Sequence, residues 1–296
     1  MRPEQVPARI AFIGLGVMGE PMCRNLAQKS GAQVFAFDRD GAPLQRLRAY
    51  GVHSAASVEQ AARGADAVFL SLPSGEVVRE VSEAAGGLLD CAARGQLVVD
   101  LSTSPVELTR DLAARFDERG ATFVDSPVAR TRAAAEAGTL SVMVGAQPSV
   151  FERIRPWLAT FASDITLCGP VGCGQVVKIL NNMVLFETVL AIAEAKAIGE
   201  RSGVDPALLF DTLSKGSADS FALRNHGMKA MLPGDFPERA FSVSYARKDL
   251  AYALALAEDA GVDAKGARLV RELFARAETE GVSDRYWPVI GTLIGR

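Results

Sequence analysis

The stretch Phe12-Ile13-Gly14-Leu15-Gly16-Val17-Met18-Gly19 decides the fold, because it spaces three glycines as G-x-G-x-x-G directly after an apolar run. In a dinucleotide-binding turn, the first glycine permits the bend out of the strand and the second lets the backbone approach a pyrophosphate. The third lets the next helix pack closely, and the free N–H groups at the start of that helix face the phosphates. The alternative is an ordinary strand-to-helix turn without a ligand.

Asp38 adds a second feature at matching distance, since it lies nineteen residues beyond Gly19 at the end of another apolar run, Val34 to Phe37. A carboxylate at this position accepts hydrogen bonds from ribose hydroxyls and repels a 2′-phosphate, which favours NAD. The neighbouring Arg39 is able to reach a 2′-phosphate, so NADP stays open. The two features together predict a nicotinamide dinucleotide cofactor.

The composition excludes several classes of function. The chain has 296 residues and a formal net charge of −3 without a run of Lys or Arg, so we expect no nucleic-acid partner. No apolar stretch reaches about twenty uninterrupted residues, and the first five residues lack a signal-peptide core, so we expect a cytoplasmic protein without membrane association. Four cysteines without a C-x-x-C pair and two histidines predict no metal site.

The pattern of expected secondary structure changes near residue 170. Before this point, short β-like runs alternate with helical stretches, which predicts an α/β, doubly wound parallel sheet over residues 1–170. After it, a long apolar helix from Gln175 to about Ser202 and further helices predict an all-α domain over residues 171–296. A helix apolar nearly all round belongs either to a single helical core or to a homodimer or homotetramer interface. The expected strands are 9–13, 33–37, 67–71, 97–101, 121–124, 140–144 and 164–167, and the later helices are 206–215, 242–260, 264–280 and a short piece from 285.

A polar group interrupts the long helix. Lys178 and Asn182 are four residues apart, so they share one helix face, and Asn181 is their neighbour. Polar side chains in an apolar helix are costly unless they face a ligand. The alternative is a lysine that extends to solvent beside an asparagine that bonds backbone.

Six ordered motifs resemble the β-hydroxyacid dehydrogenase family, to which 3-hydroxyisobutyrate dehydrogenase belongs. They are FIGLGVMGEPMCRNL (12–26), Leu72-Pro73, Ser102-Thr103, DSPVARTRAAAEAGTLSVMVG (125–145), GCGQVVKILNN (172–182) and ARKDLAYAL (246–254). The resemblance implies an N-terminal Rossmann domain, a helical C-terminal domain and reversible NAD(P)-linked oxidation of a small anionic β-hydroxy acid. It places the catalytic lysine on Lys178 and substrate binding on Asn181 and Asn182. It places cofactor contacts on Gly14, Leu15, Gly16, Val17, Met18, Gly19, Asp38, Leu72, Pro73, Thr103 and Lys248.

One motif departs from the family. Most members have Ser-Gly-Gly after the Pro-Val pair, whereas this chain has Ala129-Arg130-Thr131. That variant is similar to the sulfolactaldehyde reductase branch, in which the arginine meets the anionic head of the substrate. We therefore expect Arg130 and Thr131 to bind substrate, with Arg130 as the anion anchor. An arginine that points to solvent or pairs with Glu136 is the alternative.

The expected mechanism is hydride transfer with Lys178 as the general acid and base, its pKa lowered by partial burial and by Arg130. Four alternatives stay open: a sulfolactaldehyde or semialdehyde reductase, a β-hydroxy amino acid dehydrogenase, an imine reductase, and a sensor that binds NADH without oxidising it. Lys178 argues against the imine reductase.

Overall fold

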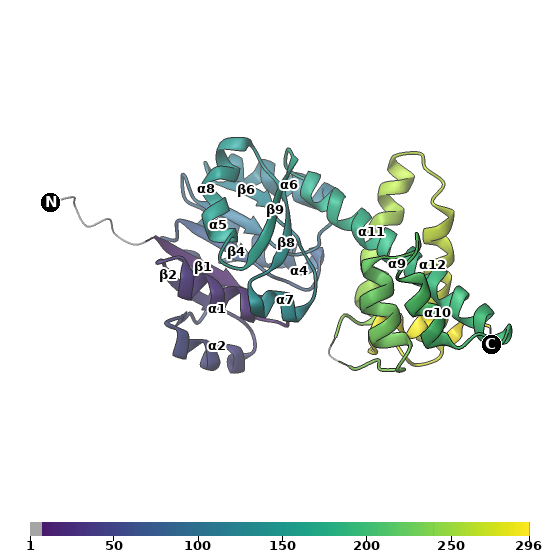
Figure 1. The fold of residues 1–296 in the computed structure, drawn as a ribbon. Helices are drawn as coiled ribbons and strands as arrows, with labels where there is room; N and C mark the ends of the chain where they lie inside the picture. The colour runs from purple at the N-terminus through teal and green to yellow at the C-terminus, as the bar shows by residue number, and fades with distance from the viewer. Residues whose placement is uncertain (1–7, 239, 296) are drawn as a thin grey trace. The chain divides into compact units, whose positions relative to one another are not determined.

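A computed structural model describes residues 8–238 and 240–295 (Figure 1). Backbone packing divides the chain into two compact units, Met1–Lys178 and Ile179–Arg296. The first unit contains a sheet of nine strands within the described residues, and its path begins β3-β2-β1-β4-β5-β6, the order typical of dinucleotide-binding sheets. These strands are β1 (Arg9–Ile13), β2 (Gln33–Phe37), β3 (His53–Ser54), β4 (Ala67–Leu70), β5 (Leu97–Asp100) and β6 (Thr122–Asp125).

The central strands are buried on both faces. Every residue of β4 and β5 is buried, as expected for parallel strands covered by helices on each side. Alternate residues enter two different apolar clusters: Phe12 packs with Phe69 in one, and Ile13 packs with Leu70 in the other. The continuous apolar runs of the sequence therefore form a doubly wound sheet, which confirms the predicted fold class.

Helices connect the strands and cover the sheet (Figure 1). Ser57, Ser74 and Thr131 cap three of them, each accepting a hydrogen bond from a backbone N–H of the first turn. The helices of this unit are α1 (Gly19–Lys29), α2 (Gly41–Leu47), η1 (Arg48–Tyr50), α3 (Val58–Ala62), α4 (Gly75–Glu83), α5 (Leu88–Cys91), α6 (Val106–Asp117), α7 (Arg132–Ala137) and α8 (Pro148–Leu158).

One side of the sheet is mixed. Strand β8 (Leu140–Gly145) runs antiparallel to β6 and to the short β7 (Val128–Ala129), and β9 (Ala162–Gly169) pairs parallel with β8. The predicted parallel pairing holds for β1 to β6 and for β8 with β9, and the antiparallel pairs at this side were not predicted. A two-residue strand such as β7 or β3 is too short to show an alternating pattern.

The second unit contains helices and only isolated bridges in its described residues. The helices are the part of α9 (Cys173–Arg201) from residue 179, α10 (Pro206–Leu213), η2 (Leu223–Met231), α11 (Val243–Asp259), α12 (Lys265–Thr279) and η3 (Trp287–Leu293). Phe186 of α9 lies at the centre of the core, with the rings of Trp287 and Phe274 4.8 and 5.5 Å away. Helix η2 is a π-helix, which sequence periodicity does not reveal.

Helix α9 continues from one unit into the other. Its length and composition would allow it to cross a membrane, a test that the core helix of a soluble protein also passes. Phe186, Val189 and Ala193 of this helix belong to the core of the second unit. The domain boundary at residue 170 stays a prediction; α9 begins at Cys173, and the two compact units meet after Lys178.

Candidate active site

The three glycines of the first turn are needed for different structural reasons. Gly14 has φ of +93°, and a Cβ there would lie 2.2 Å from the Ser71 carbonyl oxygen. A Cβ on Gly19 would lie 2.1 Å from the Gly14 carbonyl oxygen. A Cβ on Gly16 would meet no atom within 4 Å. Internal packing therefore explains Gly14 and Gly19, whereas the open space at Gly16 fits a ligand that approaches the backbone.

Asp38 connects the end of β2 to the glycine-rich turn. The Leu15 N–H donates to its Oδ2 at 2.5 Å, and the Asp40 N–H donates to its Oδ1 at 2.7 Å. Each carboxylate oxygen accepts more than one hydrogen bond, so this half-buried group keeps capacity for ribose hydroxyls. The adjacent Arg39 forms an exposed ion pair with Glu80 of α4.

The remaining predicted cofactor contacts of the first unit follow parallel strands. Leu72 and Pro73 come after β4 and Thr103 comes after β5, so they share the carboxyl edge of the sheet with the glycine-rich turn. The Ser102 hydroxyl accepts a hydrogen bond from the Leu72 N–H at 2.9 Å, which joins the two segments. This edge is where ligands bind in open α/β sheets.

Two buried carboxylates lie at the same edge and were not expected from the sequence. Asp100 and Asp125 are paired in register at the ends of β5 and β6. The Ser102 N–H and the Ser104 hydroxyl donate to Asp100, and burial raises the pKa of Asp100 to about 6. Burial also raises the pKa of Asp125, although backbone N–H groups oppose the shift. The available signal was an aspartate ending each of two apolar runs.

Asp125 accepts hydrogen bonds from the start of α9. Its Oδ1 accepts from the Gly172 N–H at 2.7 Å, and its Oδ2 accepts from the Gln175 N–H at 2.8 Å. The first turn of α9 is thereby tied to the end of β6. Lys178 follows one turn later and is half-buried.

Arg130 does not point freely to solvent. Its guanidinium pairs with Asp164 at 2.8 Å and donates to the Thr139 carbonyl and the Ser163 hydroxyl at 2.7 and 3.0 Å. Its φ of +88° is a left-handed conformation that glycine adopts more easily. Neither alternative raised for this residue, solvent or Glu136, describes these contacts, because Glu136 pairs with Arg132.

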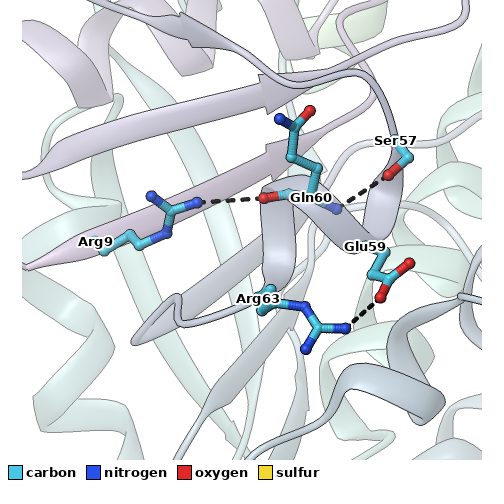
Figure 2. Close-up of a pocket in the computed structure, with 5 residues that line it drawn as sticks. All are labelled: Arg9, Ser57, Glu59, Gln60 and Arg63. Carbon is cyan, nitrogen blue, oxygen red and sulfur yellow. Dashed lines mark hydrogen bonds and ion pairs between the residues drawn. The ribbon is translucent and has the colours of Figure 1, made fainter.

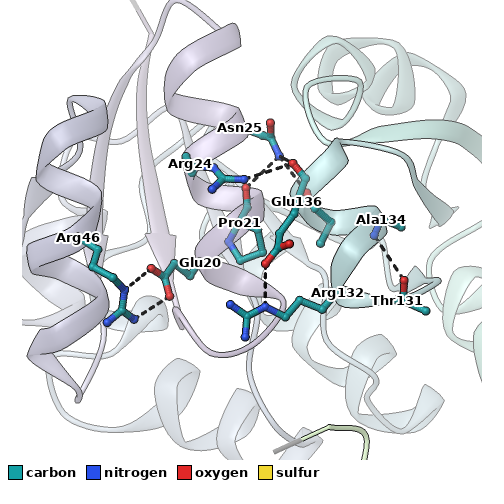
Figure 3. A network of polar contacts seen from close by, with 10 residues as sticks. Glu20, Pro21, Arg24, Asn25, Arg46, Thr131, Arg132, Ala134 and Glu136 are labelled. Atoms are coloured by element: carbon teal, nitrogen blue, oxygen red, sulfur yellow. Dashed lines mark hydrogen bonds and ion pairs between the residues drawn. The ribbon is translucent and has the colours of Figure 1, made fainter. Parts of the chain in front are cut away.

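Side chains of α1 hold the helix that Thr131 begins, α7 (Figure 3). The Thr131 hydroxyl accepts a hydrogen bond from the Ala134 N–H and caps α7. Buried Asn25 of α1 donates to the Ala135 carbonyl at 2.9 Å, and Arg24 donates to the Glu136 carbonyl. The loop that carries Arg130 and Thr131 is therefore anchored at its helical end.

The helical unit contains its own polar chain. Asn181 donates to the Asn182 Oδ1 at 3.1 Å, and buried Asn182 donates to the Asp249 Oδ2 at 2.7 Å. Lys248 forms an ion pair of 2.7 Å with Asp249 and lies over the Tyr252 ring. Asp249 joins the predicted substrate residue to the predicted cofactor residue, and the sequence showed no role for it.

A surface pocket lies at the other end of the sheet (Figure 2). It has a volume of about 540 Å³ and is lined by Arg9, Ser57, Glu59, Gln60 and Arg63. Arg9 begins β1, so this pocket is at the amino edge of the parallel strands. None of the predicted site residues lines it.

The fold and the glycine-rich turn define an NAD(P)-binding oxidoreductase. A family model described as the NAD-binding domain of 6-phosphogluconate dehydrogenase matches residues 9–169. A second model, described as the NAD-binding region of NADP-dependent 3-hydroxyisobutyrate dehydrogenase, matches residues 172–286. The chain belongs to the β-hydroxyacid dehydrogenase family.

Three similar proteins illustrate the family. The chain is 34% identical to 2-(hydroxymethyl)glutarate dehydrogenase of Eubacterium barkeri, over 93% of this chain and 90% of that protein. It is 37% identical to 3-hydroxyisobutyrate dehydrogenase of Pseudomonas aeruginosa, over 92% and 95%. A solved structure of Mycobacterium tuberculosis 3-hydroxyisobutyrate dehydrogenase with L-serine is 31% identical, with a TM-score of 0.88 over 98% of this chain and 100% of that one. The protein is thus an NAD(P)-dependent hydroxy acid oxidoreductase.

Proposed function

We propose that this protein interconverts a small β-hydroxy carboxylic acid and its aldehyde or ketone, with Lys178 as the general acid and base. The observation that carries the proposal is the glycine-rich turn with open space at Gly16, on the same sheet edge as Asp125, which ties down the start of the helix that bears Lys178. A nicotinamide cofactor, when bound, supplies or accepts the hydride.

The residues of this chain would bind the cofactor, transfer the proton and orient the substrate. The backbone of residues 14–19, with Asp38, Leu72, Pro73 and Thr103, would hold the cofactor, and the proposed role of Lys248 is to contribute a positive charge to its binding. Lys178 removes the alcohol proton in oxidation and returns it in reduction. Asn182, held by Asp249, orients the substrate oxygen.

The substrate class follows from charge and from the named relatives. The relatives act on hydroxy acids that carry carboxylates, and L-serine is a β-hydroxy acid as well. Arg130 offers a guanidinium to such an anion, in exchange for its exposed partner Asp164. A sulfonate head group would use the same exchange, so sulfolactaldehyde remains the second candidate.

The cofactor preference follows from Asp38. Its carboxylate lies beside the turn that would receive the pyrophosphate, and Arg39 next to it is paired with Glu80. A 2′-phosphate would meet the negative charge of Asp38 and would have to displace Glu80 to reach the arginine. We therefore propose NAD as the preferred cofactor.

Initial rates test the proposal directly. The panel contains 3-hydroxyisobutyrate, 2-(hydroxymethyl)glutarate, L-serine, tartronate semialdehyde, succinic semialdehyde and sulfolactaldehyde, each with NAD(H) and with NADP(H). Lys178→Ala should lower kcat by a factor on the order of 10³ with NADH binding unchanged, because proton transfer alone contributes about 10²–10⁴. Full turnover by Lys178→Ala would remove the lysine from the mechanism. NADH binding without turnover of any substrate would favour a sensor.

We also propose that α9 forms a contact between copies of this chain, as a homodimer or homotetramer. Leu180, Val184 and Ile198 are 39%, 57% and 66% exposed, and their spacing places them along one side of the helix. Light scattering should give a mass of two or four chains for the wild type, and Val184→Glu should give monomers. A wild-type monomer at micromolar concentration would contradict this proposal. The expected cytoplasmic location stays a prediction.

A further inference from the structure

Gln175 makes an unusual connection for a glutamine in an apolar helix. It is fully buried in the first turn of α9, and its side chain reaches the segment that follows β5. Its Oε1 accepts a hydrogen bond from the Ser104 N–H at 3.1 Å, and its Nε2 donates to the Ser102 carbonyl at 2.8 Å. Because the planar amide bonds at both ends, it fixes the distance and the rotation between helix and segment.

The surrounding backbone leaves this turn little freedom. Asp125 accepts hydrogen bonds from the Gly172 and Gln175 N–H groups, as described above. A Cβ on Gly174 would lie 2.3 Å from the Met143 carbonyl oxygen, and a Cβ on Gly145 would lie 2.3 Å from the Asp125 Oδ1. The start of α9 therefore packs with its backbone against the ends of β6 and β8.

We propose that Gln175 is a positioning residue that keeps Lys178 in register with Thr103. The inference rests on the proposed roles of these two residues in proton transfer and cofactor binding. Lys178 is three residues beyond Gln175, so it lies on the same side of the helix one turn later. Thr103 lies between the two residues that the Gln175 amide holds. Loosening this bridge would let the proton-transfer group and the cofactor-binding segment move independently.

Gln96 provides a matched control in the same unit. It is 4% exposed, and its Nε2 donates to the Ala62 and Ala65 carbonyls at 3.0 and 2.9 Å. It precedes β5, so it lies at the amino edge of the sheet. Gln96→Ala and Gln175→Ala each remove two buried hydrogen bonds to backbone, so their losses of stability should be similar.

Four measurements compare the two variants. Gln175→Ala should lower kcat tenfold or more, since a misplacement of about 1 Å costs on the order of 10² in rate. It should leave the Kd for NADH unchanged and increase the isotope effect with NADH deuterated at C4. In the protein without cofactor, amide exchange should rise at Ser104 and in the first turn of α9. Gln96→Ala should change none of these.

Several outcomes would overturn the inference. Equal losses of kcat in both variants, or unchanged exchange at Ser104, would make Gln175 a structural residue only. If Gln175→Ala does not fold, Gln175→Met removes the same bonds with nearly the same volume and takes its place. Full turnover by Lys178→Ala would refute the proposed role of Lys178, whereas the exchange measurement would still report whether Gln175 holds the two segments together.

Discussion

The two units of this protein hold their buried polar groups by different means. In the N-terminal unit, Asp125 accepts hydrogen bonds from backbone N–H groups at the start of α9, and Gln175 bonds to backbone groups of the segment that follows β5. In the C-terminal unit, the Asn182 side chain donates to Asp249, and Asp249 also pairs with Lys248. Backbone partners are placed by the main-chain path at the strand ends and the helix start, whereas side-chain partners depend on three residues being present together. Main-chain geometry therefore determines the cofactor edge, whereas residue identity determines the helical polar chain.

Burial shifts the pKa of an acid in one unit and of a base in the other. The first buries an acid, Asp100, whose pKa is raised to about 6 by burial. The second buries a base, His226, whose pKa is lowered to about 4 by burial. Both groups are thus held toward their neutral forms, so a change of pH should destabilise the two units in opposite directions.

The largest expected effect tests whether main-chain geometry governs the cofactor edge. Gly14→Ala should lower the free energy of unfolding by about 3 kcal/mol or more, because it adds a left-handed alanine and a clash with backbone. Urea unfolding followed by circular dichroism measures the loss. The same change at Gly31, which has φ of +70° and open space around a Cβ, isolates the conformational cost. A Gly14 variant no less stable than the Gly31 variant would contradict the close approach.

The next effect concerns His226 in the helical unit. Its Nδ1 and the Tyr286 hydroxyl share a hydrogen bond of 2.7 Å, and its ring centroid lies 5.1 Å from that of Trp287. The contribution of neutral His226 to the free energy of unfolding is fully present above pH 6.5. Below that pH the imidazole binds a proton in the unfolded chain, whereas in the folded chain it stays neutral down to about pH 4. The free energy of unfolding should therefore fall by up to about 3 kcal/mol across that window. Urea unfolding at several pH values should show this slope in the wild type and not in His226→Gln.

A somewhat smaller effect of opposite sign is expected for Asp100 in the sheet. Its folded pKa lies above the ordinary value of 3.8, so its contribution to stability is complete below pH 3.8 and is lost as pH rises through about 6. The loss should reach at most about 3 kcal/mol. Asp100→Asn keeps a partner for Ser102 and Ser104 and should remove this dependence. If the variant and the wild type show the same pH profile, Asp100 is not the responsible group.

The smallest effect on stability is expected at Gly16. Gly16→Ala should change the free energy of unfolding by less than about 0.5 kcal/mol, because the added methyl group meets no atom. It should nevertheless weaken NADH binding at least tenfold if the open space receives the pyrophosphate. Fluorescence titration of NADH measures this. Unchanged binding would show that the space at Gly16 is not used by the cofactor.

Much of the fold was predictable because its signals are local. The strands at 9–13 and 33–37 occur where expected, and helix α9 begins within two residues of the predicted start. The short strands β3 and β7 and the π-helix η2 were missed, because two residues show no period and a π-helix does not follow the α-helical one.

The candidate site was predictable only in part. The glycines, Asp38 and Lys178 carry motif spacing, so the sequence indicated them. Asp249 and Gln175 lie within recognisable motifs, but no local spacing indicates a role for either side chain. Their roles depend on distant partners: Asp249 bonds to a residue 67 positions away along the chain, and Gln175 to residues 71 or more positions away.

The family, the doubly wound sheet, the dinucleotide turn and the helical second half could be predicted from the chain alone, because each depends on residue types at fixed short spacing. Three features became visible only in the folded protein: Asp125 and Gln175 tie α9 to the sheet, Arg130 is paired with Asp164, and Asp249 supports Asn182. Hydrogen bonds between distant segments depend on how strands and helices pack, which no pattern along the chain encodes locally.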